Sequence, residues 1–136
     1  MPRTGWLRKL LGDRGERLAV RFLSQRGYVI VARQSRSAIG EIDIIALDRN
    51  SPGGETVVFV EVKTRSQQQA GAPTEAVNLT KQRQLTRAAL TWLKRRRWLG
   101  RRTRFDVVAV LWQGPAEPVV THYQHAFEAV GVDGMY

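Results

Sequence analysis

The sequence contains no cysteine among its 136 residues. This absence excludes disulfide bonds, zinc sites built on cysteine and catalysis by a thiol, and it suits a reducing compartment. No stretch approaches the ~18 consecutive apolar residues that a membrane-spanning helix needs, and the basic N-terminal residues are not followed by the apolar core of a signal peptide. We therefore expect a cytoplasmic protein with no membrane partner.

Acidic residues are absent from one long segment. Residues 76–104 contain ten Lys or Arg and no Asp or Glu, which leaves twelve basic residues elsewhere to balance all twelve acidic ones. The net charge of +10 is thus concentrated in one place. Such a patch most often binds a polyanion, because contacts to phosphates release counterions. We expect nucleic acid as the partner; a solvated helix face, an acidic protein and a membrane surface are the alternatives.

The length and composition are those of one globular domain. The chain is 43% apolar and 25% charged, and it has five prolines and no internal repeat. A chain of this length can bury one core but is too short for two comfortable domains. We expect a single domain over residues 1–136, with its core at about residues 12–125.

Apolar periodicity predicts the helices and strands. Residues 11–23 repeat their apolar side chains every three or four positions, and Gly27 can end that helix. Residues 50–54 have the composition of a turn, so the strands on either side are expected to pair as a hairpin. The expected helices cover 12–26 and 79–97 with a short helical end at 126–130, and the expected strands cover 28–33, 41–47, 56–64, 104–111 and 119–123. The order α-β-β-β-α-β-β is that of an α/β protein with a mixed sheet of about five strands flanked by helices.

The second expected helix is amphipathic. Leu85 and Trp92 belong to its apolar stripe, whereas Arg83 and Arg87 project from the opposite side. We expect the basic side to bind nucleic acid. The candidate nucleic-acid-binding residues are Arg83, Arg87, Lys94, Arg95, Arg96 and Arg97 around this helix, and Arg33 and Arg36 ahead of the second strand.

Three charged residues interrupt apolar strands. Asp43, Glu61 and Lys63 lie in runs of Val, Ile and Phe, where a charge is costly unless something compensates it. Because side chains alternate along a strand, Glu61 and Lys63 share one face of theirs. By the same rule Asp43 lies on one face of the preceding strand, opposite Ile42 and Ile44. We expect the hairpin to bring the three charged side chains together on a single sheet face.

A divalent cation would compensate these charges. Two carboxylates held close repel each other unless a proton or a cation lies between them, and hard oxygen ligands suit Mg²⁺ or Mn²⁺. We expect Asp43, Glu61 and the carbonyl of Val62 to bind the ion, with Lys63 beside the attacking water or the scissile phosphate. That arrangement indicates metal-assisted hydrolysis. The alternative is a solvent-facing strand edge on which Lys63 pairs with the two acids.

Several stretches together resemble the YraN family of bacterial proteins, whose function is uncertain. They are GDRGERLAVRFLSQRGY, GEIDIIALD, VVFVEVKTRS, AVNLTKQRQLTRAALTWL and RFDVVAV, and they span residues 12–110. The order of a helix Glu, a strand Asp and a strand Glu-Xaa-Lys also resembles the restriction-endonuclease-like nucleases, and is similar to the archaeal Holliday-junction resolvases. Gln34 and Ser35 depart from the family pattern, which has an Asn and an aromatic residue there, and the turn 48–55 is longer than usual.

The resemblance implies a restriction-endonuclease-like fold and metal-dependent cleavage of phosphodiester bonds in structured or branched DNA, rather than RNA. It adds Glu16 to the candidate catalytic residues Asp43, Glu61 and Lys63. It also implies that such nucleases can act as homodimers, although nothing in the sequence shows an interface. Fold analogy does not transfer activity, so a non-catalytic nucleic-acid-binding module in a repair, uptake or RNA-associated complex is the alternative function.

Other polar residues are expected near the site or away from it. Glu41 shares the face of Asp43 and is expected beside the site without binding the ion. Lys81 lies on the sheet-facing side of the second helix near its start, where the nuclease fold implies a polar residue close to the site. His122 and His125 have no acid partner in a recognisable relation, so we expect no role for them in the chemistry.

Overall fold

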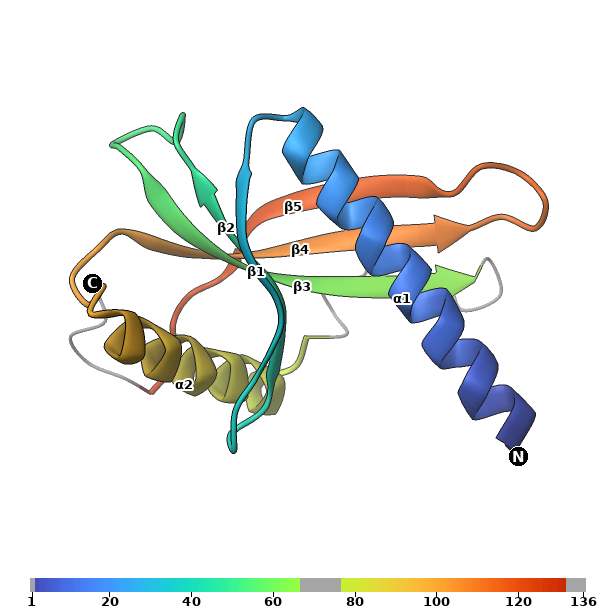
Figure 1. The fold of residues 1–136 in the computed structure, drawn as a ribbon, viewed down its shortest axis with the longest axis horizontal. Coiled ribbons are helices and arrows are strands. Elements are labelled where there is room, and N and C mark those ends of the chain that lie inside the picture. Colours follow the sequence, from blue (N-terminus) through green and yellow to red (C-terminus); the bar gives the residue numbers. More distant parts are fainter. Residues whose placement is uncertain (1, 67–76, 132–136) are drawn as a thin grey trace.

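The computed structural model describes residues 2–66 and 77–131. Residue 1 and residues 67–76 and 132–136 of the predicted domain lie outside that description. The elements are helix α1 (Pro2–Gln25), strands β1 (Val29–Arg36), β2 (Glu41–Asp48) and β3 (Thr56–Ser66), helix α2 (Leu79–Arg96), and strands β4 (Thr103–Trp112) and β5 (Val119–Phe127) (Figure 1). The predicted α/β class and the order α-β-β-β-α-β-β are confirmed. In the described part of the chain, neither helix has an apolar run able to cross a membrane.

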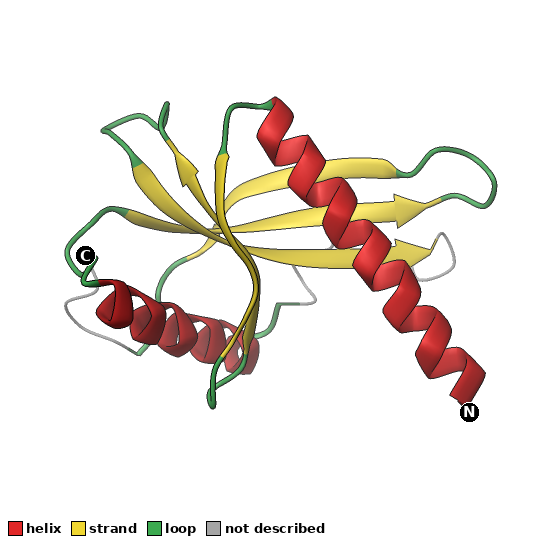
Figure 2. Cartoon of the chain, viewed as in Figure 1, coloured by secondary structure: helices red, strands yellow, loops and turns green. Residues whose placement is uncertain are grey.

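The strands form one mixed sheet in the order β1-β2-β3-β4-β5. Neighbouring strands are antiparallel except for β3 and β4, which are parallel and are connected through α2. Parallel neighbours need a crossover connection, and a helix is the usual one. The predicted hairpin of β2 and β3 is confirmed. Figure 2 shows that the sheet is strongly twisted, with the two helices well apart from each other.

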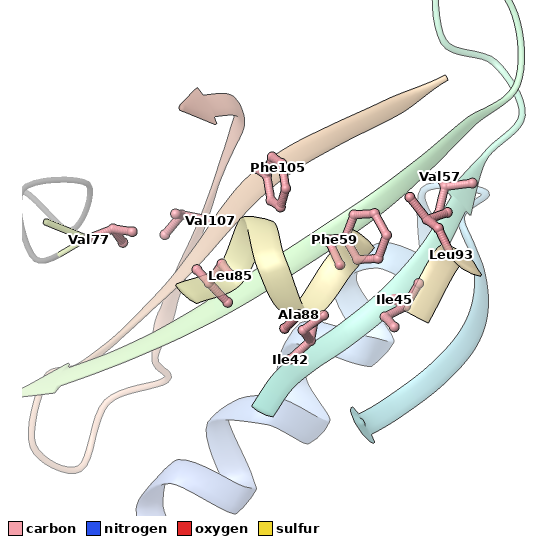
Figure 3. Packing of buried hydrophobic residues seen from close by; sticks show 11 residues of the cluster. Ile42, Ile45, Val57, Phe59, Val77, Leu85, Ala88, Leu93, Phe105 and Val107 are labelled. Atoms are coloured by element: carbon pink, nitrogen blue, oxygen red, sulfur yellow. The ribbon is translucent and has the colours of Figure 1, made fainter. Parts of the chain in front are cut away.

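Each helix covers its own face of the sheet and its own hydrophobic cluster. On the α2 side, Phe59 and Phe105 pack with Leu93 of the helix (Figure 3). On the α1 side, Leu23 packs with Val58 and with other small aliphatic residues of the strands. Burying one such side chain stabilises the fold by about 1.5–3 kcal/mol. The central strands are therefore largely apolar on both faces, and the charged residues Glu61 and Asp106 inside them are exceptions.

Helix α1 and strand β5 extend well beyond their predicted bounds. Helix α1 begins at Pro2 rather than at residue 12. Gly5, Gly12 and Gly15 have low helix propensity, so the sequence did not indicate a helix this far toward the N-terminus. Strand β5 continues to Phe127, so the predicted short helix at 126–130 is wrong. Phe127 pairs with Phe105 across the sheet, and the two rings stack with centroids 4.8 Å apart. This contact favours strand over helix at the C-terminal end of β5.

The start of α2 was predicted correctly, and its caps explain why. The side chain of Asn78 accepts a hydrogen bond from the backbone amide of Lys81, which is the usual N-cap contact. At the other end Arg97 adopts a left-handed conformation with φ of 59°, and its amide bonds back to the last turn. The helix is thus fixed at both ends, with Lys94, Arg95 and Arg96 in its last turn.

Candidate active site

Strands β2 and β3 separate at one end. Their ladder runs from the pair Asp48 and Thr56 to the pair Ile44 and Val60. Beyond it, Oδ2 of Asp43 accepts a hydrogen bond of 2.8 Å from the backbone amide of Val62. A carboxylate thus stands where the carbonyl of a paired strand would accept. Because the N–H and C=O of one strand residue point to the same side, the Val62 carbonyl is directed toward the same opening.

The alternation of β2 breaks at Asp43. Ile44 belongs to the cluster under α1, whereas Ile42 belongs to the cluster under α2, so the two lie on opposite faces. The prediction that Ile42 and Ile44 share a face is therefore wrong. The physical reason is the end of the β2–β3 ladder: past Ile44 the strand still pairs with β1, through Ile42 and Ser35, but no longer follows the pleat set by β3.

A groove of about 350 Å³ lies over this opening on the α1 side. Helix α1 approaches β3 closely there: Gly15 leaves room for this approach, and a Cβ added to it would collide with the hydroxyl of Thr64. The next residue along the helix is Glu16, which is only 7% exposed. The groove is lined by Gly12, Asp13, Glu16, Gln34, Arg36, Glu41, Asp43, Val62 and Thr64. The structure thus brings Glu16 to the same groove as Asp43, as the resemblance implied.

Two neighbours from β1 contact Glu16. Nε2 of Gln34 donates to Oε2 at 3.4 Å, and Nε of Arg33 lies 3.6 Å from Oε1. Consecutive strand residues ordinarily point to opposite faces, but Gln34 has a left-handed backbone with φ of 48°, which lets both side chains reach the same carboxylate. Burial raises the pKa of Glu16, and the contacts with Gln34 and Arg33 only partly offset this. Glu16 is thus a buried acid with loose partners.

Glu61 and Lys63 remain together on β3. Nζ of Lys63 lies 3.5 Å from Oε1 of Glu61, and the two side chains are 19% and 9% exposed, respectively. The second carboxylate oxygen of Glu61 is buried without a hydrogen-bond partner among the described residues, as is Oε1 of Glu16. Buried polar atoms nearly always have partners, so these two oxygens call for an explanation.

Asp43 has the most perturbed carboxylate of the groove. Burial raises its pKa to about 7, with the charge of Glu61 as the next cause, while the hydrogen bond from Val62 opposes the shift. The charges of Glu16 and Glu41 raise it further. Four carboxylates therefore act on one another here, but only three have an ion-pair partner in the described part of the chain. Those pairs are Glu16 with Arg33, Glu41 with Arg36, and Glu61 with Lys63.

A divalent cation fits this donor set. Its donors are hard oxygens, which Mg²⁺ or Mn²⁺ prefers. A cation would also stabilise the charge of Asp43, whose pKa is raised by burial and by neighbouring carboxylates, and would give the unpartnered oxygen of Glu61 a ligand. No three Asp, Glu or His side chains of residues 2–66 and 77–131 are arranged to hold a metal by themselves. The side chains Asp43 and Glu61 would therefore need the Val62 carbonyl and outside oxygens to complete a coordination shell. Mg²⁺ commonly keeps such outside ligands.

The predicted residues of α2 do not converge on the groove. Lys81 is half-buried in the first turn, and its ammonium has no ion pair or hydrogen bond within the described residues. Arg83 and Arg87 are exposed and line a separate depression with Ala38 and Ile39 at the β1–β2 turn. The remaining predicted basic residues, Lys94, Arg95, Arg96 and Arg97, are exposed at the far end of the helix, where Arg96 lies over the rings of Trp92 and Trp98.

Sequence reasoning missed two features of the molecule. On α1, Arg14, Arg17 and Arg21 are all exposed, and the spacing of three and four residues would have shown that they share one side of a helix. The second feature is a buried network around Arg104 and Asp106. Nε2 of His122 lies 2.7 Å from Oδ2 of Asp106, so the expectation that His122 lacks an acid partner is wrong. The register of β4 and β5 sets this contact, by pairing His122 with Val108.

Comparisons with known proteins agree with the resemblance. The model of a family described as "Uncharacterised protein family UPF0102" matches residues 15–110, and this confirms the predicted YraN family. A UPF0102 protein of Geotalea uraniireducens is 48% identical over 120 residues, which are 88% of this chain and 91% of the relative. A second, of Rhodopirellula baltica, is 48% identical over 128 residues, 93% of this chain and 75% of the relative. A third, of Nocardia farcinica, is 43% identical over 88% of this chain and 91% of its own length.

Proposed function

We propose that this chain, which belongs to the uncharacterised protein family UPF0102, is a cytoplasmic nuclease that uses Mg²⁺ or Mn²⁺ to hydrolyse phosphodiester bonds in structured or branched DNA. The observation that carries the proposal is Asp43. It lies where two strands separate, and its carboxylate has no cationic partner among the described residues. Burial, followed by the charge of Glu61, raises its pKa to about 7. Strongly perturbed acids in a groove mark functional sites more often than structural ones.

Each residue of the site has a role in this proposal. Asp43, Glu61 and the Val62 carbonyl would hold the cation, which would polarise a phosphoryl oxygen and make water a better nucleophile. Lys63, which lies beside Glu61 with its side chain 19% exposed, would neutralise charge that develops on the phosphate. Glu16 and Glu41 add negative charge around Asp43 and favour cation binding. The groove is open to solvent, so a phosphate backbone can reach these groups.

The surface supports nucleic acid as the substrate. Exposed arginines extend along both helices, at positions 14, 17 and 21 of α1 and 83 and 87 of α2, on opposite faces of the sheet. Arg36 lines the groove itself, with its side chain 74% exposed. Positive charge on both faces of the sheet, together with Arg36 in the acidic groove itself, suits binding of a polyanion. The fixed positive surroundings also offset the repulsion between a phosphate and the four carboxylates.

A cleavage assay tests the proposal. Labelled single-stranded, duplex, flap and four-way-junction DNA are incubated with Mg²⁺ or Mn²⁺ and with the parent, Asp43→Asn or Glu55→Gln. Glu55→Gln is the matched control, because it removes one carboxylate charge from an exposed ion pair with Arg49 in the β2–β3 turn. We expect cleavage by the parent and the control, and a loss of at least about 100-fold in Asp43→Asn with binding retained. Equal cleavage by Asp43→Asn would refute the assignment.

A non-catalytic nucleic-acid-binding module is the second candidate, favoured by the exposed arginines of α2. It predicts binding that weakens steeply with salt, does not depend on Mg²⁺, and is lost when Arg83, Arg87 and Lys94 are changed to Glu. Each phosphate contact removed should reduce the slope of log affinity against log salt by about one. Cleavage by the parent that requires a divalent cation would exclude this candidate.

A further inference from the structure

We propose that Arg33 exchanges partners during binding. It neutralises Glu16 in the free protein and moves to a phosphate when a nucleic acid strand enters the groove, so that nucleic acid and the divalent cation bind cooperatively. This inference rests on the proposed function, because it assigns regulation to the same groove. It concerns binding alone and does not require that the protein cleave its substrate.

The geometry of the Arg33 contact suits an exchange. The guanidinium approaches Glu16 with one nitrogen at 3.6 Å, which is an ion pair without the two parallel hydrogen bonds that hold a firm Arg–carboxylate contact. The Arg33 side chain is 43% exposed, whereas that of Glu16 is 9% exposed. A guanidinium has five N–H donors in a fork that matches phosphate. Arg33 can therefore turn toward a strand in the groove, while Glu16 must stay.

Gln34 keeps Glu16 in place when Arg33 leaves. Its amide donates to the other carboxylate oxygen, and its left-handed backbone, with φ of 48°, directs the side chain to that oxygen. A non-glycine residue in this conformation is uncommon and marks a position where the surroundings fix the backbone. Two consecutive residues thus act on the Glu16 carboxylate in different ways: Gln34 orients it, and Arg33 balances its charge.

The exchange changes the charge seen by Asp43. Glu16 and Asp43 line the same groove, so the charge of one carboxylate acts on the other. When Arg33 moves to a phosphate, Glu16 is left uncompensated and the groove attracts a cation more strongly. Coupling of this kind is reciprocal, so a bound cation must also favour the nucleic acid. The neighbouring pair of Arg36 and Glu41 is 74% and 39% exposed, and water screens its charges whether or not it is intact.

Binding of a short, fluorescently labelled oligonucleotide tests the exchange. Its Kd is measured by anisotropy with Mn²⁺ and with NaCl at the same ionic strength, and a gel of each sample records any cleavage. The readout is the Kd in NaCl divided by the Kd in Mn²⁺. We expect this ratio to be about fivefold larger in the parent than in Arg33→Gln, with Arg33→Lys recovering part of the difference. Arg49→Gln is the matched control and should keep the parent's ratio, because Arg49 pairs with Glu55 in the β2–β3 turn.

The outcomes separate this inference from the proposed function. A parent-like ratio in Arg33→Gln overturns the exchange even if the protein cleaves DNA. A ratio that depends on Arg33 supports the exchange even if no substrate is cleaved, in which case the proposed hydrolysis fails alone. An oligonucleotide that does not bind under either condition overturns both. Equal losses in Arg33→Gln and Arg49→Gln also overturn the exchange, because they would trace the effect to net charge.

Discussion

Two groups of buried charged residues lie on this sheet, and they are built differently. The first, called here the arginine cluster, consists of Asp48, Arg104, Asp106 and His122. Asp106 at its centre is fully buried. Its carboxylate accepts hydrogen bonds from Nε and Nη2 of Arg104 and from the amide of His125, and it lies 2.7 Å from His122. Although burial alone would raise it, the pKa of Asp106 is lowered by the contacts with His122 and Arg104. Every charge in this cluster has a partner.

The groove cluster consists of Glu16 and Asp43, which line the groove, and of Glu61 and Lys63, which flank the groove residue Val62 on β3. It lacks this completeness. One buried oxygen of Glu16 and one of Glu61 have no hydrogen-bond partner among the described residues. Here burial and the charges of neighbouring carboxylates outweigh the hydrogen bond from Val62, and they raise the pKa of Asp43 to about 7. The same fold thus fully satisfies one buried acid and leaves another under-compensated. The arginine cluster is compensated within the fold, whereas the groove cluster keeps the buried negative charge that the proposed cation would balance.

The largest expected effect comes from breaking the arginine cluster. Arg104→Met leaves Asp48 and Asp106 without the guanidinium that contacts them at 3.0 and 2.8 Å. Removing one partner of a buried ion pair costs about 3–5 kcal/mol, because the remaining charge stays buried. We expect a loss of this size in the free energy of unfolding, measured by urea denaturation at neutral pH. The groove that contains Asp43 is not part of this cluster.

A conservative variant keeps that prediction testable if Arg104→Met does not fold. Arg104→Lys retains the charge but not the forked contacts, since Nη1 of Arg104 also donates to Ser51 and Nη2 also donates to Tyr28. It should be less stable than the parent and more stable than Arg104→Met. A fully parent-like stability of Arg104→Met would mean that the cluster contributes nothing, and the contrast with the groove would disappear.

The groove should behave in the opposite way: removing its charge should stabilise the protein. The folded-state pKa of Asp43, about 7, lies above its ordinary value of 3.8, so the native state binds the extra proton between these pH values. Stability from this group is therefore present at acidic pH and is lost as the pH rises toward 7. At pH 8, without divalent cations, we expect Asp43→Asn to exceed the parent by roughly 1 kcal/mol, a figure reduced for the solvent-open groove.

The pH dependence separates this effect from a general benefit of the amide. Below pH about 4 the parent's Asp43 is protonated in both states, so the advantage of Asp43→Asn should vanish there. Glu55→Gln, on the exposed turn pair with Arg49, should show no such dependence. Thermal unfolding of the three proteins across this pH range, with a chelator present, is the measurement. A variant less stable than the parent at pH 8 would show that the Asp43 charge is compensated after all.

The two clusters also differ in how far the sequence revealed them. The sequence drew attention to Asp43, Glu61 and Lys63 because they are charges inside apolar strands, and such exceptions are visible without a structure. Glu16 needed the family resemblance, since its burial depends on how closely α1 approaches β3 at Gly15. The arginine cluster could not be predicted, because it depends on the register of β4 and β5. A shift of one residue would turn His122 away from Asp106.

The smallest expected effect on stability comes from Arg33 near the groove, which is compared with Arg104 of the arginine cluster. Arg33 pairs with Glu16 from an exposed position, and burial raises the pKa of Glu16 despite that pair. An exposed ion pair contributes about 0–1 kcal/mol, so Arg33→Gln should change the free energy of unfolding by less than about 0.5 kcal/mol, close to Arg49→Gln. The same urea titration used for Arg104→Met measures it. A loss near that of Arg104→Met would make Arg33 a structural residue tied to Glu16, and would leave it no freedom to turn toward a phosphate.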